Sequence, residues 1–143
     1  MFLGQYRHTV DKKGRLVLPA RFRERLSRGC VVTKGQERCL YVFPMDRWEE
    51  EAEKYRQLPR TDARARRLTR AFFAGAIDQE LDAAGRIQVP VRLRDYAGLD
   101  REVAVIGVEE RAEIWDSSAW DQYDAEADNY YSNIEEAFSD FGI

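Results

Sequence analysis

The chain has 143 residues, of which 44% are hydrophobic and 12% aromatic, and its formal net charge at pH 7 is −3. This composition excludes an intrinsically disordered chain, which combines low hydrophobicity with high net charge. No apolar run approaches the ~18 residues needed to cross a bilayer, and the amino terminus lacks the continuous apolar core of a signal peptide. We therefore expect a soluble, cytoplasmic protein that does not contact a membrane.

The charge is divided unevenly along the chain. Residues 1–71 hold 18 Lys and Arg against 9 Asp and Glu, a balance of +9, whereas residues 72–143 hold 5 against 17, a balance of −12. Screening limits the reach of a charge to about 10 Å at ordinary salt, so the local concentration of charge matters more than the total. The asymmetry predicts a basic working surface on an otherwise acidic protein.

Hydrophobic periodicity and turn residues predict seven elements in the first half of the chain. Between the first two strands, Asp11 can accept bonds from the backbone of its own turn and Gly14 can supply a positive φ. Pro19 suits the first position of a helix, and Asp62 suits the amino-terminal cap of another. In chain order we expect strands over residues 2–10 and 15–18, a helix over 19–28, strands over 30–34 and 39–43, and helices over 45–57 and 62–76.

The second half of the chain repeats this plan. Residues 81–97, LDAAGRIQVPVRLRDYA, align without a gap with residues 10–26, VDKKGRLVLPARFRERL, at a shift of 71 residues. The identical pairs are Asp11 with Asp82, Gly14 with Gly85, Arg15 with Arg86, Pro19 with Pro90, Arg21 with Arg92 and Arg23 with Arg94. Two copies of ~70 residues are too long for solenoid units, and they predict two halves that pack together. A last helix is expected over 117–128.

The D-x-x-G-R turn is followed both times by an apolar strand, a proline and a short arginine-bearing helix. The chain also begins MFLGQYRHTVDKKGRLVLP, and it contains LYVFPMDRWEE in its first half and IWDSSAW in its second. In this combination the sequence closely resembles the MraZ family of bacterial transcriptional regulators, which are built from two tandem SpoVT-AbrB-type units. The likeness runs from Met1 to about Tyr123, and only the acidic tail is expected to fall outside it.

The resemblance implies an α+β, β-rich fold in which two swapped-hairpin units form one β-barrel with pseudo-two-fold symmetry and short helices outside it. We divide the chain into a first unit at residues 1–57, a connecting helix at 58–76, a second unit at 77–123 and an acidic carboxy-terminal tail at 124–143. The resemblance further implies a ring-shaped, nucleoid-associated homo-oligomer. This ring would bind short repeats in the double-stranded promoter DNA of the cell-division and cell-wall gene cluster, including that of its own gene.

The matching motif implies that Arg15 and Arg86 lie on the DNA-facing edge. The planar fork of arginine can bind a phosphate or the edge of guanine bidentately, and lysines add point charges for phosphates. The second turn has alanines in place of the two lysines, so we expect it to bind DNA more weakly. His8 is expected to extend the basic edge. The residues expected to contact DNA are Arg7, Lys12, Lys13, Arg15 and Arg86, and those expected to form the turns are Asp11, Gly14, Asp82 and Gly85.

Alternatives remain open at this point. Arg15 and Arg86 could pair with Asp11 or Asp82 and only brace the turns. The arginines of the helix over 19–28 could contact DNA or equally lie on a solvated face or at a subunit contact, and those of the helix over 62–76 favour a solvated face. The whole chain could also be an oligomeric ring scaffold that binds proteins rather than DNA.

The sequence carries no pattern typical of an enzyme. No Ser or Cys nucleophile lies near a base, the only histidine has no triad, and neither a P-loop nor a Rossmann glycine pattern occurs. Cys30 and Cys39 fit no common zinc spacing, and we expect both to be small buried side chains rather than a disulfide. We therefore expect no catalytic residue, no metal, no cofactor and no small-molecule substrate.

Overall fold

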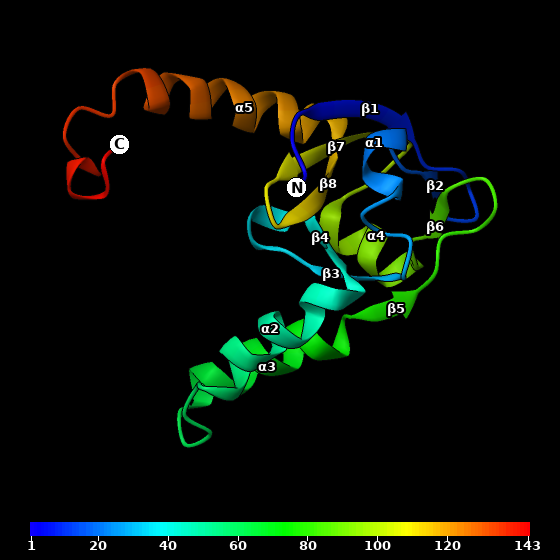
Figure 1. Cartoon of the computed structure of the whole chain (residues 1–143), viewed down its shortest axis with the longest axis horizontal. Helices are drawn as coiled ribbons and strands as arrows, with labels where there is room; N and C mark the ends of the chain where they lie inside the picture. Colours follow the sequence, from blue (N-terminus) through cyan, green and yellow to red (C-terminus); the bar gives the residue numbers. More distant parts are fainter.

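The computed structural model describes residues 1–143 and has a β-rich body from which helices project on one side (Figure 1). Six strands form an antiparallel sheet. In spatial order they are β1 (Gln5–Thr9), β7 (Glu102–Val108), β8 (Arg111–Asp116), β4 (Leu40–Pro44), β3 (Cys30–Lys34) and β5 (Ile77–Gln79). A separate two-stranded sheet pairs β2 (Arg15–Val17) with β6 (Arg86–Gln88). The α+β class expected from the sequence is confirmed.

The large sheet does not close into a barrel. Its edges are β1 and β5, which pair only with β7 and β3. Proline has no N–H to donate to a ladder, so Pro19 and Pro90 end the strands that precede them and keep β2 and β6 short. The short pair packs against the same 18-residue hydrophobic core as the large sheet, with Leu16 and Ile87 both buried in it. The expected closed barrel is therefore replaced by an open sheet and a packed β2–β6 pair.

Five helices and two single turns complete the chain. They are α1 (Ala20–Arg23), η1 (Gln36–Arg38), α2 (Met45–Arg56), α3 (Ala63–Ala74), α4 (Val91–Ala97), α5 (Ser117–Ser132) and η2 (Ser139–Phe141). The first helix is shorter than the expected 19–28, because after Arg23 the chain continues in tight turns: the N–H of Leu26 is shared between Phe22 and Arg23, and that of Gly29 bonds to Leu26. The last helix extends beyond the expected 128 because no Gly or Pro interrupts it before Ser132. No helix is both long and apolar enough to span a membrane.

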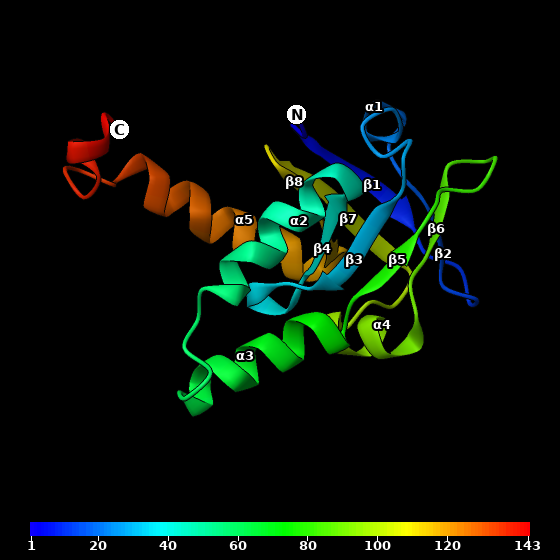
Figure 2. The same ribbon diagram turned by 60° about the horizontal axis from the view of Figure 1, so that its bottom comes forward.

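The two halves interlock through β2 and β6, which run side by side in Figures 1 and 2. Leu16 pairs with Ile87, its equivalent at the shift of 71, while Arg15 pairs with Gln88 and Val17 with Arg86. Exchanging the halves therefore leaves the register unchanged. Two further bonds obey the same exchange: the Leu18 N–H donates to the Gly85 carbonyl at 3.1 Å, and the Val89 N–H donates to the Gly14 carbonyl at 2.7 Å. Each turn is thus held by the chain of the other half.

The helices α2 and α3 form an arm, defined here as residues 45–74, that lies outside the body (Figure 2). Aromatic rings join the two helices: Trp48 stacks on Phe72 with centroids 5.4 Å apart, and Tyr55 stacks on the same ring at 4.1 Å. The arm is fixed to the sheet by the hydroxyl of Thr33, which donates to the Phe72 carbonyl at 2.6 Å. The last carbonyls of a helix lack intrahelical partners, so this buried bond satisfies one of them.

We predict that Thr33→Val destabilises the protein by about 1–3 kcal/mol, because the buried Phe72 carbonyl loses its donor. Thr33→Ser is the matched control, since it keeps the hydroxyl and removes only a methyl group, and it should be affected less. Urea unfolding followed by tryptophan fluorescence, at one fixed protein concentration, measures both. Equal stability of Thr33→Val and the natural chain would show that this bond does not anchor the arm.

Candidate nucleic-acid interface

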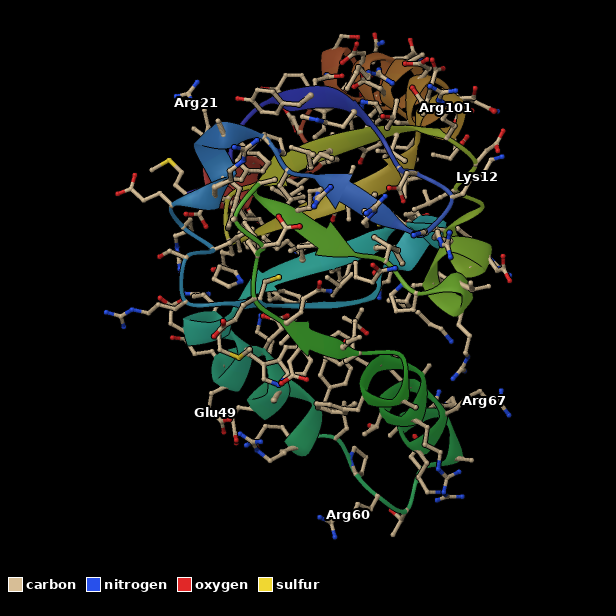
Figure 3. The ribbon with its side chains drawn as sticks, turned by 90° about the vertical axis from the view of Figure 1, so that its right-hand side faces the viewer. Lys12, Arg21, Glu49, Arg60, Arg67 and Arg101 are labelled. Carbon is tan, nitrogen blue, oxygen red and sulfur yellow. The ribbon has the colours of Figure 1, made fainter.

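The two D-x-x-G-R turns lie at the same end of the molecule, on the side away from the arm and α5 (Figures 1 and 2). The first turn links β1 to β2 and the second links β5 to β6, so the β2–β6 pairing brings them together. This end faces the viewer in Figure 3, where Lys12 lies on it and the arm residues Arg60 and Arg67 lie far below. The structure therefore separates the two clusters of basic residues in the first half of the chain.

Each turn is built around its aspartate in the same way. Oδ1 of Asp11 accepts the N–H groups of Lys13 and Arg15, both at 2.9 Å, and its Oδ2 accepts Nε of Arg15 at 2.6 Å. Asp82 accepts the N–H groups of Ala84 and Arg86 at 2.9 Å and Nε of Arg86 at 2.7 Å. The pKa of both carboxyl groups is lowered, first by the backbone N–H of the turn's arginine and then by its side chain. Each carboxylate thus accepts three hydrogen bonds from its own turn, and the two turns have the same conformation.

Both turns need glycine. Gly14 has φ +83° and Gly85 has φ +77°, values that L-residues with a side chain rarely adopt. A Cβ at residue 14 would lie 2.3 Å from the carbonyl oxygen of Val89, and one at residue 85 would lie 2.5 Å from Nε of Arg23. In both turns the aspartate therefore accepts backbone N–H groups of its own loop and the glycine supplies the positive φ, at Asp11 and Gly14 and at Asp82 and Gly85.

The arginine after each glycine is held by its aspartate, but only part of its guanidinium group is hydrogen-bonded. The side chains of Arg15 and Arg86 are 43% and 37% exposed, and each uses only its Nε in the pair with the aspartate of its own turn. The terminal nitrogens of both guanidinium groups have no partner in the protein. The bracing suggested as an alternative therefore exists, and it leaves the outer part of each fork available to a ligand.

The charges that flank the two arginines differ. Lys12 and Lys13 are exposed and form no ion pair, whereas exposed Ala83 and Ala84 occupy the equivalent positions. Counting Arg15 and Asp11 with the lysines gives the first turn a balance of +2, and Arg86 with Asp82 gives the second a balance of zero. The first turn therefore attracts anions more strongly.

Two of the residues expected at this edge are engaged elsewhere or uncharged. Arg7 lies on β1 and turns toward α5, where it pairs with Asp121 at 2.6 Å and donates to Oγ of Ser117 at 2.6 Å. The pKa of His8 is lowered by burial and by the nearby charge of Arg23, so this ring is neutral at pH 7. The structure thus gathers Lys12, Lys13, Arg15 and Arg86 at one end, and it commits Arg7 to α5.

Three further arginines lie close to the turns and were not assigned there from the sequence. Nε of Arg23 donates to the Leu18 carbonyl at 2.9 Å beside Gly85, and Arg94, its equivalent in the repeat, donates to the Lys12 carbonyl at 3.3 Å. Arg94 thus bonds to the turn of the other half, whereas Arg23 bonds within its own half and packs beside the other turn. The repeat alignment contained this signal, because both helices keep an arginine at the same position. Arg101 is exposed near Lys12 (Figure 3), and the β1–β7 pairing together with the bond from Val10 N–H to the Arg101 carbonyl places it there.

The structure offers no site for metal or thiol chemistry. No three His, Cys, Asp or Glu side chains gather as metal ligands. Cys30 and Cys39 are both free and buried, and burial raises the pKa of Cys30 to about 12, which leaves the thiol protonated and unreactive. The tryptophans contribute to packing instead of presenting flat platforms: Trp115 is 4% exposed and contacts Trp120 at 5.2 Å.

Comparison with known proteins assigns the chain to a family. The family model described as "MraZ protein, putative antitoxin-like" matches it twice, over residues 1–71 and 72–141. The chain belongs to the MraZ family. A protein of Moorella thermoacetica named transcriptional regulator MraZ is 51% identical over 143 residues, the full length of both chains. Those of Natranaerobius thermophilus and Salinispora arenicola, with the same name, are 46% identical over the full length and 51% identical over 95% of this chain and 96% of the relative.

The MraZ likeness extends through the carboxy-terminal segment. The second family match runs to residue 141, and two of the relatives align over all 143 residues. The expectation that the acidic tail falls outside the likeness was therefore wrong. The motifs that carry the resemblance end at the IWDSSAW segment, and the tail has no turn motif of its own by which to recognise it.

We predict that Asp11 and Asp82 titrate below the usual aspartate range. A lowered folded-state pKa stabilises the turn above the unfolded pKa, and this contribution is lost as pH falls through the folded value. Arg15→Ala should raise the pKa of Asp11 only part of the way, because the stronger influence is the backbone N–H at position 15. Carboxyl ¹³C NMR titration measures both groups, and Asp82 in the same variant is the internal control. A full return of Asp11 to the usual range would contradict this account.

Proposed function

We propose that this chain is a transcriptional regulator that binds promoter DNA in a sequence-specific manner through the end of the molecule formed by its two turns. The observation that carries the proposal is the pair of arginine forks, Arg15 and Arg86, whose outer nitrogens are unpartnered on one exposed end. Such forks suit phosphates and the edge of guanine. The relatives' name, transcriptional regulator, supports the same role.

The exchange symmetry of β2 and β6 supports two equivalent DNA-reading units. We propose a pseudo-two-fold axis through the Leu16–Ile87 pair, with residues 1–57 and 77–123 as the two units, 58–76 as the connecting helix and 124–143 as the acidic tail. In this proposal the β2–β6 pair corresponds to the strands that the swapped hairpins exchange between the two units. Each unit then presents one braced arginine, and the partner unit holds that arginine's turn in place.

A single protomer presents too little positive charge for tight binding. Its first turn has a balance of +2 and its second a balance of zero. Non-specific and specific affinity for DNA both rise with the number of phosphates neutralised, so several protomers must act together. A ring-shaped homo-oligomer on repeated promoter boxes supplies that avidity. We infer a cytoplasmic, nucleoid-associated regulator of the cell-division and cell-wall gene cluster, including its own gene, that needs no cofactor and performs no catalysis.

The two turns should contribute unequally to DNA binding. We predict that Arg15→Ala lowers specific affinity by about 1–3 kcal/mol per engaged site, and more across a ring. Lys12→Ala with Lys13→Ala should weaken binding to all sequences alike and flatten the salt dependence by roughly two phosphate contacts. Arg86→Ala should have a smaller effect than Arg15→Ala, because no lysine flanks it. Titration of labelled promoter DNA at two salt concentrations measures all three.

Arg67→Ala is the matched control for this titration, since it removes an exposed arginine from the arm (Figure 3) and should leave affinity unchanged. The oligomeric state of every variant is checked first. If Arg15→Ala keeps the natural oligomer and binds like the natural chain, the turn is only structural and the DNA-binding edge is elsewhere. Binding of proteins but no salt-dependent binding of promoter DNA would favour a ring scaffold instead.

A further inference from the structure

The arm contains an apolar cleft that the chain leaves open. The aromatic rings that join α2 and α3 end with Tyr55 and Phe73, whose centroids are 5.6 Å apart. Beyond them Leu58 and Pro59 break the connection between the helices, and a cleft of about 290 Å³ remains. Its floor consists of these side chains, so it can accept an aromatic or aliphatic group.

The rim of this cleft is strongly basic. Arg56, Arg60, Arg66 and Arg70 line it, and no Asp or Glu does. Only Arg56 has acidic partners, Glu49 and Glu53; the other three arginines form no ion pair with any carboxylate. An apolar floor beside three arginines without acidic partners fits a segment that carries both aromatic and acidic side chains. Duplex DNA matches the rim but not the floor, because its bases are stacked inside the double helix.

The carboxy-terminal segment, residues 129–143, has the complementary composition. It contains no Lys or Arg and holds Glu135, Glu136 and Asp140, none of which forms an ion pair. All of its large apolar side chains except half-buried Ile134 are exposed to solvent, by 59% at Tyr130, 76% at Tyr131, 44% at Phe138, 77% at Phe141 and 76% at Ile143. Exposed aromatics gathered on one short segment mark an interaction surface.

The segment is held away from the arm of its own chain. The first turns of α5 are fixed to the body by the Trp115–Trp120 contact and by the Arg7–Asp121 pair. From there α5 is one continuous helix that leaves the body separately from the arm (Figures 1 and 2). No hydrogen bond, ion pair or aromatic contact joins residues 129–143 to the arm. In a homo-oligomer, residues 129–143 of one copy can therefore reach the arm cleft of a neighbouring copy without a bend in α5.

We propose that the cleft between α2 and α3 receives the carboxy-terminal segment, residues 129–143, of a second copy of this chain. The inference rests on the homo-oligomer of the proposed function and says which surfaces form it. The contact is head-to-tail, because the segment of one copy occupies the arm of the next, and such contacts close into rings when the rotation allows. Aromatic and arginine side chains are the residues that dominate protein interfaces. The arm and α5 both leave the body away from the turns, so this assembly leaves the DNA-facing end free.

Charge reversal on either side of the contact tests the proposal. The arm variant carries Arg66→Glu with Arg70→Glu, and the segment variant carries Glu135→Arg with Glu136→Arg. Each places like charges across the contact, so sedimentation velocity at micromolar concentration should show smaller species and a dissociation constant raised by about tenfold or more. Mixing the two full-length variants should restore the natural oligomer, because each then meets a partner of opposite charge. Arg64→Glu with Arg67→Glu, two arginines that do not line the cleft, is the control and should not change the oligomer.

Two results would overturn the docking. One is that both charge-reversal variants remain the same size as the natural oligomer, and the other is that they dissociate and mixing restores nothing. In either case the natural chain is still an oligomer and its promoter binding can be intact, so the proposed function survives. A natural chain that sediments as a monomer overturns the docking and the ring together, and promoter titration then decides the DNA-binding role separately.

Discussion

The close approach of the two turns to the opposite half of the chain is the constraint on which the structure depends. The carbonyl of Gly14 accepts the Val89 N–H, and that of Gly85 accepts the Leu18 N–H. A side chain at residue 14 would lie 2.3 Å from the carbonyl oxygen of Val89, so this approach exists only with glycine. It sets the β2–β6 register, which buries Leu16 against the core and places both arginine forks on one end. The packing of the core and the position of the candidate interface therefore both depend on the β2–β6 pairing.

The bracing aspartates orient the arginines of the candidate interface although they reduce its charge. Each holds Nε of the arginine four residues later, so the guanidinium is already oriented when a ligand arrives. A preorganised fork loses less conformational freedom on binding than a free one. The reduction in charge is offset only in the first turn, by Lys12 and Lys13. The repeat thus supplies two similar shapes, and substitutions at two positions make their electrostatics unequal.

Local sequence patterns predicted the local structure and missed what depends on distant contacts. The turns and the proline-started α4 follow from residues close together in the chain, and the repeat alignment indicated that the halves pack on each other. The open sheet was not predicted, because its edges are the two strands with a partner on one side only, β1 and β5, and such long-range pairing has no local signal. The engagement of Arg7 by Asp121, 114 residues later, carries no local signal either. The contacts of Arg23 and Arg94 with the turns were missed for the same reason, although the matching positions of these two arginines in the repeat could have suggested them.

The uneven charge of the chain predicted one basic surface, but the fold distributes the basic residues over two separate surfaces. Lys12, Lys13 and Arg15 lie at the turns, whereas the arginines at 60–70 lie on the arm at the other side of the molecule (Figure 3). A bare row of arginines along α3 would attract DNA at any sequence and, in the proposed function, draw the protein away from promoter DNA. An acidic segment from a neighbouring copy in the arm's cleft would neutralise that charge wherever the protein assembles. If both proposals hold, the acidic segment 129–143 would confine DNA binding to the turns, and the contact that builds the oligomer would also improve its selectivity.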